Sequence, residues 1–434
     1  SGKSGLKPAD SRIISFITQK KQNGFGDAVR AASAWIRSRR SGRLLILCGD
    51  TPLVRAQTLS QLARIHSAER NAVTLCSMEP ADPSGYGRIV RDDNGVISGI
   101  VEENDASVEQ KAIREVNSGI YCFDAKPLLQ GLPKLKNQNA KREFYLTDLI
   151  EIFYNLGQKV GVSRIEPENG LADFPETMGI NSRADLAQAE SLLQDQIRQR
   201  WMKSGVTLIA PASIYIGEQV VIGPDTVLLP GTILLGKTRI GPDCRVGPNT
   251  YMENSVLGRN VIARASFIYG TQVGDSVQIG PFTHLRPGTV VQSGARIGNF
   301  TEIKKSRIGK NSKVSHLAYI GDAVLGENIN VGAGAITCNF DGEKKHPTYV
   351  GSNSFIGSNV NLVAPVRIGA GSLIGAGSTI TRDVPPDSLA LERAPQTVKR
   401  GWMKKKRKPE LSIWLRAGRR KRRGFSRNKK VQAG

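Results

Sequence analysis

The sequence is poor in cysteine and has no long apolar run. Its five cysteines, Cys48, Cys76, Cys122, Cys244 and Cys338, are odd in number, far apart in the chain and without a CxxC pair. This pattern argues against a disulfide framework or a zinc site and favours reduced thiols in a cytoplasm. No stretch of about 18 consecutive apolar residues occurs, so the sequence predicts no membrane span.

Positive charge gathers at the end of the chain. The formal net charge is +23, and fourteen Lys or Arg residues but only one acidic residue, Glu410, follow Trp402. Such a segment can attach to nucleic acid or an anionic membrane through salt-dependent contacts. The few aromatic residues near it make a poor stacking platform for bases. We therefore expect a disordered tail over 401–434 and no nucleic-acid partner; a polyanion-binding protein is the alternative.

Apolar residues recur at every sixth position in the second half of the chain. A period of six fits neither an α-helix nor a half-buried strand. It predicts a parallel β-helix, in which each flat face of a coil buries one apolar residue. Gly often follows the inward residue, where a corner leaves little room for a Cβ. A β-sandwich, the alternative, would alternate polar and apolar residues between turns. The two runs are Ile216, Ile222, Leu228, Leu234, Ile240, Val246 and Met252, then Val350, Ile356, Leu362, Ile368, Ile374 and Ile380.

The first half of the chain has an α/β pattern. The apolar run 44–48 predicts a buried parallel strand. Asp50 follows at its carboxyl tip, where ligands of open α/β sheets bind. Residues 27–37 and 58–65 look helical. Ser182 and Asp185 form a capping-box pattern that begins a further helix, ended by Gly205.

The second half departs from its period in one segment. Residues 339–347 interrupt the hexapeptide pattern, which predicts a loop that projects from the coils. In solenoids such insertions often lie on the binding face.

The order of several motifs resembles the GlmU family of bifunctional glucosamine-1-phosphate N-acetyltransferases and N-acetylglucosamine-1-phosphate uridylyltransferases. The resemblance covers residues from about 19 to 402 and implies a homotrimer. It implies an α/β nucleotidyltransferase (Rossmann-like) domain followed by a left-handed parallel β-helix (hexapeptide repeat). The motifs include Gly85-Tyr86-Gly87-Arg88, Leu285-Arg286-Pro287-Gly288, Gly298-Asn299-Phe300, Ser315-His316-Leu317, Tyr319-Ile320-Gly321-Asp322, Thr337-Cys338-Asn339 and Arg393-Ala394-Pro395-Gln396.

Acetyl transfer to a sugar amine needs a base, because the amine is largely protonated at neutral pH. His316 is the candidate, being one of four histidines and the one in the block that resembles the family's catalytic motif. A sugar 1-phosphate also needs cations. The resemblance assigns Arg286, Lys304, Tyr319, Asn330 and Lys345 to the acetyl acceptor, and Ala333, Asn339, Phe340, Ser358, Ala376 and Arg393 to acetyl-CoA. The family has Tyr at the position of Phe340, so one hydroxyl contact is either absent or replaced here.

Uridylyl transfer from UTP needs Mg²⁺ to neutralise phosphate oxygens. Asp50 at a strand tip is a suitable hard ligand. The resemblance assigns Gln19, Gly24, Gly87, Glu102, Asn117 and Asn181 to UTP or the UDP-sugar, and Asp50 and Asn181 to the metal.

Two departures weaken the resemblance in the front half. The family's GxGTRM phosphate loop has no counterpart, and Phe25 stands where the family's uracil segment has Thr. We therefore expect an N-terminally truncated, incomplete domain over 1–183, lacking its first strand and Gly-rich loop. A linker helix over 184–205 and acetyltransferase coils over 206–400 follow. The expected substrates are glucosamine-1-phosphate, acetyl-CoA and UTP, with weak or absent uridylyl transfer; a monofunctional acetyltransferase with an inactive front domain is the alternative.

Overall fold

The computed structural model describes residues 15–38, 42–167 and 174–405. The chain forms two compact units, Ser1–Gln199 and Arg200–Gly434, which we call the α/β unit and the coil unit. The division falls inside one helix, so the four-part domain limits stay a prediction. The basic tail beyond residue 405 lies outside the described residues.

The α/β unit is built on a mixed sheet. Its strands run in the order β4-β3-β5-β2-β6, and β1 also pairs with β5. β2 and β6 are parallel, whereas β5 is antiparallel to β1, β2 and β3. The strands are β1 (Arg43–Ile46), β2 (Val73–Met78), β3 (Arg88–Arg91), β4 (Ile97–Val101), β5 (Val116–Asp124) and β6 (Val160–Arg164).

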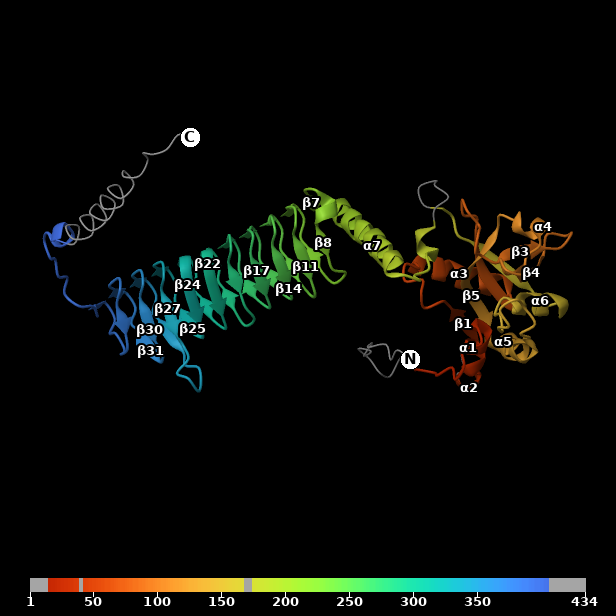
Figure 1. Cartoon of the computed structure of the whole chain (residues 1–434), viewed down its shortest axis with the longest axis horizontal. Helices are drawn as coiled ribbons and strands as arrows, with labels where there is room; N and C mark the ends of the chain where they lie inside the picture. Colours follow the sequence, from red (N-terminus) through yellow and green to blue (C-terminus); the bar gives the residue numbers. More distant parts are fainter. Residues whose placement is uncertain (1–14, 39–41, 168–173, 406–434) are drawn as a thin grey trace, which may run out of the picture. The chain divides into compact units, whose positions relative to one another are not determined.

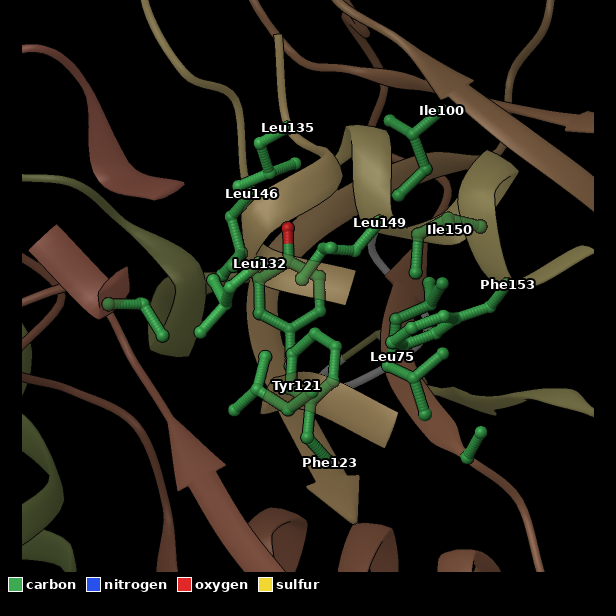
Figure 2. Close-up of a cluster of buried hydrophobic side chains, with 14 of the residues drawn as sticks. Leu75, Ile100, Tyr121, Phe123, Leu132, Leu135, Leu146, Leu149, Ile150 and Phe153 are labelled. Carbon is green, nitrogen blue, oxygen red and sulfur yellow. The ribbon is translucent and has the colours of Figure 1, made fainter. Parts of the chain in front are cut away.

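Apolar side chains cover both faces of this sheet. In β5, Tyr121 and Phe123 point into one cluster while Ile120 and Cys122 point into the other, as the alternation of a strand requires. Figure 2 shows the first cluster, where the Phe123 and Phe153 rings lie edge to face with centroids 6.2 Å apart. The helices are α1 (Phe25–Ala31), α2 (Ser33–Ser38), α3 (Ala56–Glu69), α4 (Val108–Lys111), α5 (Ala125–Gly131) and α6 (Asp148–Asn155), with 3-10 turns at Leu132–Lys134 and Pro175–Thr177.

One prediction for this unit was wrong. The run 44–48 is not a buried parallel strand: β1 is antiparallel to β5 and alternates between exposed and half-buried residues, with Leu45 43% exposed. The physical reason is that β1 is an edge strand that pairs with β5 alone among the described residues, and only Leu44 and Ile46 pack against the first cluster, which leaves Leu45 on the opposite face. The predicted helical stretch 27–37 is confirmed as α1 and α2, which are separated only at Ala32.

The helix predicted after Ser182 is present as α7 (Arg183–Lys203). Its capping box is reciprocal: the Asp185 amide donates to the Ser182 hydroxyl at 3.2 Å, and the Ser182 amide donates to the Asp185 carboxylate at 2.7 Å. Gly205 follows the helix with φ 85°, the left-handed conformation that suits a C-terminal cap.

The coil unit is a parallel β-solenoid of the hexapeptide-repeat, left-handed β-helix class, with coils stacked along one axis (Figure 1). Two connected faces form one sheet: β7 (Thr207–Leu208), β8 (Tyr215–Ile216), β10 (Val227–Leu228), β11 (Ile233–Leu235), β13 (Arg245–Val246), β14 (Tyr251–Glu253), β16 (Ile262–Ala263), β17 (Phe267–Tyr269), β19 (Gln278–Ile279), β20 (His284–Leu285), β22 (Arg296–Lys304), β24 (Lys313–Gly321), β26 (Asn330–Val331), β27 (Ile336–Cys338), β29 (Phe355–Ile356), β30 (Asn361–Val363), β32 (Leu373–Ile374), β33 (Thr379–Ile380) and β34 (Leu389–Ala390). The third face is β9 (Val221–Ile222), β12 (Arg239–Ile240), β15 (Val256–Leu257), β18 (Gln272–Val273), β21 (Val290–Val291), β23 (Arg307–Ile308), β25 (Ala323–Leu325), β28 (Thr348–Val350) and β31 (Val366–Ile368).

The six-residue period is confirmed as the inward-facing set. Every member of the two runs is buried, from Leu234 and Ile374 at 0% exposure to Ile380 at 6%. The corner glycines are also explained, because a Cβ on Gly309 would lie 2.1 Å from the Gly326 carbonyl oxygen of the next coil.

The predicted loop over 339–347 is present between β27 and β28, and it projects from the coils (Figure 1). An antiparallel bridge between Phe340 and Lys345 closes it. The coils stack without a break beneath it, because Leu325 pairs directly with Val350. Within the described part of the chain, no helix is long and apolar enough to cross a membrane.

Candidate functional site

Three cations from separate segments of the coil unit meet at one corner. Arg286 follows β20 and Lys304 ends β22 on the next coil, where the Arg286 amide donates to the Ile303 carbonyl at 2.9 Å. The loop brings Lys345 to the same place, where its side chain lies against that of Lys304. We call these three residues the cation cluster.

The cation cluster is partly balanced by acids and remains electropositive. Glu302 forms an ion pair with Arg286 at 2.8 Å. Lys345 lowers the pKa of Lys304 in two ways, because an uncharged Lys304 can accept a hydrogen bond from it and because its positive charge repels a second ammonium. Arg286 adds a smaller lowering contribution, whereas the nearby Asp322 raises this pKa. A lowered lysine pKa is the signature of like charges held together, and an anion placed among them would relieve their repulsion.

Asn339 and Tyr319 line the same corner. The buried Asn339 amide donates to the Asp322 carboxylate at 2.6 Å and to the Tyr319 hydroxyl at 3.5 Å. Asp322 therefore anchors an uncharged donor beside the cation cluster. Phe340 is exposed at the base of the loop, 58% accessible.

His316 lies at a different corner from the cation cluster. It is an exposed residue of β24, and its Nδ1 is 2.8 Å from Oδ1 of Asn299 on the preceding coil. The chain turns at Leu317, which has a positive φ of 40°, and only then reaches Tyr319. Among the described residues, no hydrogen bond or ion pair joins His316 to Asn339 or to the cation cluster within one chain.

Four of the six predicted acetyl-CoA residues, Ala333, Ser358, Ala376 and Arg393, lie in a column on the coils that follow His316, whereas Asn339 and Phe340 lie at the other corner. The Gly334 amide donates to the Leu317 carbonyl at 2.8 Å. The carbonyls of Ala333 and Ser358 each accept from the next coil at 2.8 Å, and Arg393 donates to the Ala376 carbonyl at 3.1 Å. The structure thus aligns four residues that are scattered in the sequence.

Asn330 lies away from both groups. Its position on β26 is next to Lys313 and Phe355 in the ladder. No hydrogen bond or ion pair connects its side chain with the cation cluster in the described part of the chain.

In the α/β unit, the structure brings Gly87, Glu102 and Asn117 together. The Asn117 amide donates to the Gly87 carbonyl at 2.9 Å, and a Cβ on Gly87 would lie 3.5 Å from the Glu102 carboxylate. Thr147 donates its hydroxyl to Glu102 at 2.9 Å. Asp148 is next in sequence, and burial, followed by the charges of Glu151 and Glu102, raises its pKa to about 6.

Gln19 and Gly24 form a second group. The Gln19 side chain donates to the Gly24 carbonyl at 3.2 Å and to Asp27 at 3.0 Å. Gly24 has φ 99°, and a Cβ there would lie 2.9 Å from the Phe144 carbonyl oxygen, so this turn requires glycine.

A backbone hydrogen bond holds the segments that carry the two predicted metal ligands, Asp50 and Asn181, next to each other. The Ile180 amide donates to the Asp50 carbonyl at 2.8 Å, which places Asn181 beside Asp50. Both side chains are exposed and offer oxygen ligands, which fits a hard cation. Among the described residues there is no group of three or more His, Cys, Asp or Glu that could hold a metal ion.

Sequence reasoning missed four residues that position these groups: Asn299, Glu302, Asp322 and Thr147. A spacing signal was available for two of them. In a solenoid of three hexapeptides per coil, residues about 18 positions apart are stacked. Asn299 therefore pairs with His316, and Glu302 with Tyr319.

The comparisons with known proteins agree with both units. A nucleotidyl transferase model matches residues 9–164, and a bacterial transferase hexapeptide (six repeats) model matches 270–305 and 347–382. The bifunctional protein GlmU of Halalkalibacterium halodurans is 45% identical, with 93% of this chain and 88% of that protein aligned. The proteins of the same name from Heliobacterium modesticaldum and Streptococcus mutans are 47% and 41% identical, over 91% and 90% of this chain and 84% of each relative.

Identity at this level over both units, with the motifs in one order, is more than a shared fold. The chain belongs to the GlmU family of bifunctional transferases, which joins a nucleotidyltransferase domain to a hexapeptide-repeat acetyltransferase domain.

Proposed function

We propose that the coil unit transfers the acetyl group of acetyl-CoA to the 2-amine of glucosamine-1-phosphate. The observation that carries the proposal is the cation cluster, where Arg286, Lys304 and Lys345 meet at one corner. A phosphate dianion among these cations would gain charge-assisted hydrogen bonds and relieve the repulsion that lowers the pKa of Lys304.

His316 acts as the general base. Its imidazole takes a proton from the substrate ammonium, and the freed amine nitrogen attacks the thioester carbonyl carbon. As the nitrogen–carbon bond forms, the carbon–sulfur bond breaks, and the nitrogen releases its second proton to water to leave a neutral amide. The imidazolium then returns a proton to the departing thiolate. The column of Ala333, Ser358 and Ala376 lies in line with His316 and would hold the pantetheine arm along that corner.

The site is completed in a homotrimer. Within one chain, His316 and the cation cluster lie at different corners of the coil, with the short face around residue 319 between them. A phosphate held by Lys304 and an amine held by His316 are therefore expected to belong to a substrate that spans two subunits. The exposed imidazole and a cation cluster in which Arg286 and Lys304 are half-buried and Lys345 is exposed both suit this arrangement.

The α/β unit transfers a uridylyl group from UTP to N-acetylglucosamine-1-phosphate, giving UDP-N-acetylglucosamine for cell-envelope synthesis. Gly87, Glu102 and Asn117 line one site and would bind the sugar. Asp50 and Asn181 would hold Mg²⁺, which neutralises phosphate oxygens when bound. The cysteines, each free in the structure, suit a cytoplasmic setting.

A thiol-release assay with acetyl-CoA and glucosamine-1-phosphate tests the acetyl transfer. We expect His316→Ala to lower kcat by about 100-fold or more, because a positioned base contributes at least that much. Gln278→Ala, a change on an exposed face residue of β19, is the control and should act like the wild type. Full activity in His316→Ala would refute the role given to His316.

Release of pyrophosphate from UTP and N-acetylglucosamine-1-phosphate tests the second activity. We expect Glu102→Gln to raise the KM for the sugar phosphate, because it removes the carboxylate that Thr147 orients. Thiol release by the same variant is the control and should be unchanged. Unaltered sugar-phosphate kinetics in Glu102→Gln would contradict the sugar site.

A further inference from the structure

We propose that Asn299 is a positioning residue that fixes the tautomer and orientation of His316. The inference rests on the proposed role of His316 as general base and adds a residue to which no role was assigned. The observation behind it is the 2.8 Å contact between Asn299 Oδ1 and His316 Nδ1.

The backbone fixes this contact in place. Asn299 and His316 are direct partners in the parallel ladder between β22 and β24. Gly298 permits the close approach, because a Cβ there would lie 1.9 Å from the Ser315 carbonyl oxygen. Phe300 and Leu317, the next residue on each strand, both turn the corner with positive φ, at 55° and 40°. Both side chains therefore leave the coil at the same corner on adjacent coils.

The contact determines which ring nitrogen can accept a proton. The amide oxygen of Asn can only accept a hydrogen bond, so Nδ1 of His316 must carry the proton. The lone pair then lies on Nε2, the nitrogen on the other side of the ring. Nε2 is thus the atom that takes the proton from the substrate ammonium and later returns one to the thiolate. Fixing the partner of one imidazole nitrogen to prepare the other is a general device of histidine catalysis.

Asn is suited to this task in a way that Asp is not. A carboxylate would also accept from Nδ1, but its charge would raise the imidazole pKa. Charged residues on the same two strands are Arg296 and Lys313 on the preceding face and Glu302 and Lys304 past the corner. None of these four makes a hydrogen bond or ion pair with His316 in the described residues, which leaves the neutral amide as its partner.

Steady-state acetyl transfer by the full-length protein tests the inference with three variants. Asn299→Ala should lower kcat by about tenfold or more, within the range of a misoriented base, with little change in the KM for glucosamine-1-phosphate. Asn299→Asp should recover most of the activity but shift the acidic limb of the pH–rate profile upward, since a higher imidazole pKa delays formation of the free base. Asn328→Gly is the control, because Asn328 also bonds across coils, to Asn353 at 3.2 Å, and glycine keeps its positive φ of 56°.

A spectroscopic readout separates this inference from the proposed function. Nitrogen-15 chemical shifts of the imidazoles, with His316 assigned through His316→Ala, report which nitrogen carries the proton. We expect the Nδ1–H tautomer in the wild type and a shift toward Nε2–H in Asn299→Ala. If the tautomer responds but His316→Ala keeps full activity, the positioning role stands and the role of His316 as base fails.

Two outcomes would overturn the positioning role. One is a wild-type tautomer in Asn299→Ala. The other is Asn299→Ala with the kcat and pH profile of the wild type while His316→Ala is inactive. Adding Asn299→Ala to His316→Ala should cause no further loss, because a residue that acts through His316 has nothing left to position.

Discussion

The two units assemble their sites by different rules. In the coil unit, a residue's neighbour on the next coil lies about 18 positions away in the sequence, because three hexapeptides make one coil. Asn299 thus meets His316, and Arg286 meets Lys304 on adjacent coils. In the α/β unit the contacts follow no period: Glu102 meets Thr147, and Asp50 meets the segment before Asn181. A repeat makes neighbours readable from the sequence, whereas a unique fold does not.

The largest expected difference between the two units is in their tolerance of one added methyl group. Gly309→Ala should destabilise the coil unit by about 3 kcal/mol or more, the upper end for overpacking, because the new Cβ would lie 2.1 Å from a backbone oxygen that cannot move away. Gly99→Ala in β4 of the α/β unit is the control, since its Cβ would make an ordinary contact at 3.7 Å. Thermal and urea unfolding measure both. Equal tolerance at the two sites would contradict the tight stacking of the coils.

A core change in the α/β unit should leave the coil chemistry intact. Phe153 is fully buried, so Phe153→Ala is expected to cost about 3–5 kcal/mol of folding free energy in that unit. Thiol release at 25 °C should stay at the wild-type rate, because every proposed acetyl-transfer residue belongs to the coil unit. Ile374→Ala, at an equally buried position in the coils, is the converse variant. Acetyl transfer that collapses in Phe153→Ala would show that the α/β unit contributes to the site.

Removing one charge from the cation cluster should have a smaller energetic effect than these core substitutions, on substrate binding rather than on folding. Lys304→Met should raise the KM for glucosamine-1-phosphate by about tenfold, the loss of one charge-assisted contact. Lys313→Met, at an exposed position at the start of the neighbouring strand β24, is the control.

The pH dependence of this KM follows from the lowered pKa of Lys304. As pH rises, Lys304 loses its charge before an ordinary lysine would, so phosphate affinity should decline early on the alkaline side. In Lys345→Met the neighbouring charge is gone, the pKa of Lys304 returns toward its ordinary value, and the decline should move to higher pH. An unchanged alkaline limb in Lys345→Met would contradict the coupling.

The smallest predicted effect is on the stability of the α/β unit, and it comes from Asp148, which lies near the carboxylates of Glu151 and Glu102. The pKa of Asp148 is about 6 when folded, above its ordinary value of 3.8. The folded unit therefore holds more protons in this window, and this contribution to stability is lost as pH rises through about 6. Asp148→Asn should stabilise the unit at pH 7 by about 1 kcal/mol, a figure reduced for solvent screening of a half-buried group. Unfolding curves at pH 5 and pH 7 test this, and an equal gain at both values would argue against it.

Much of the coil unit could be predicted from the sequence, because one repeating constraint fixes its core. The inward set from Ile216 to Ile380, the corner glycines and the loop at 339–347 all follow from the period. The resemblance already implied that a site lies between neighbouring subunits, but which corner carries His316 and which carries the cation cluster did not follow from the sequence. The strand at 44–48 was mispredicted because an apolar run carries no information on which strands pair with it or in which direction. In the structure, among the described residues, it pairs with one strand, β5.

The loop over 339–347, which carries Lys345, does not disturb the β-ladder beneath it. Leu325 and Val350 on adjacent coils pair directly, although the loop residues lie between them in the sequence. The rigidity of the coils and the position of Lys345 are therefore independent in this protein. The coils fix where the loop begins and ends, and the length of the loop fixes how far from the coils Lys345 lies. Substitutions in the loop over 339–347 alone are therefore expected to change substrate preference without destabilising the coils that support it.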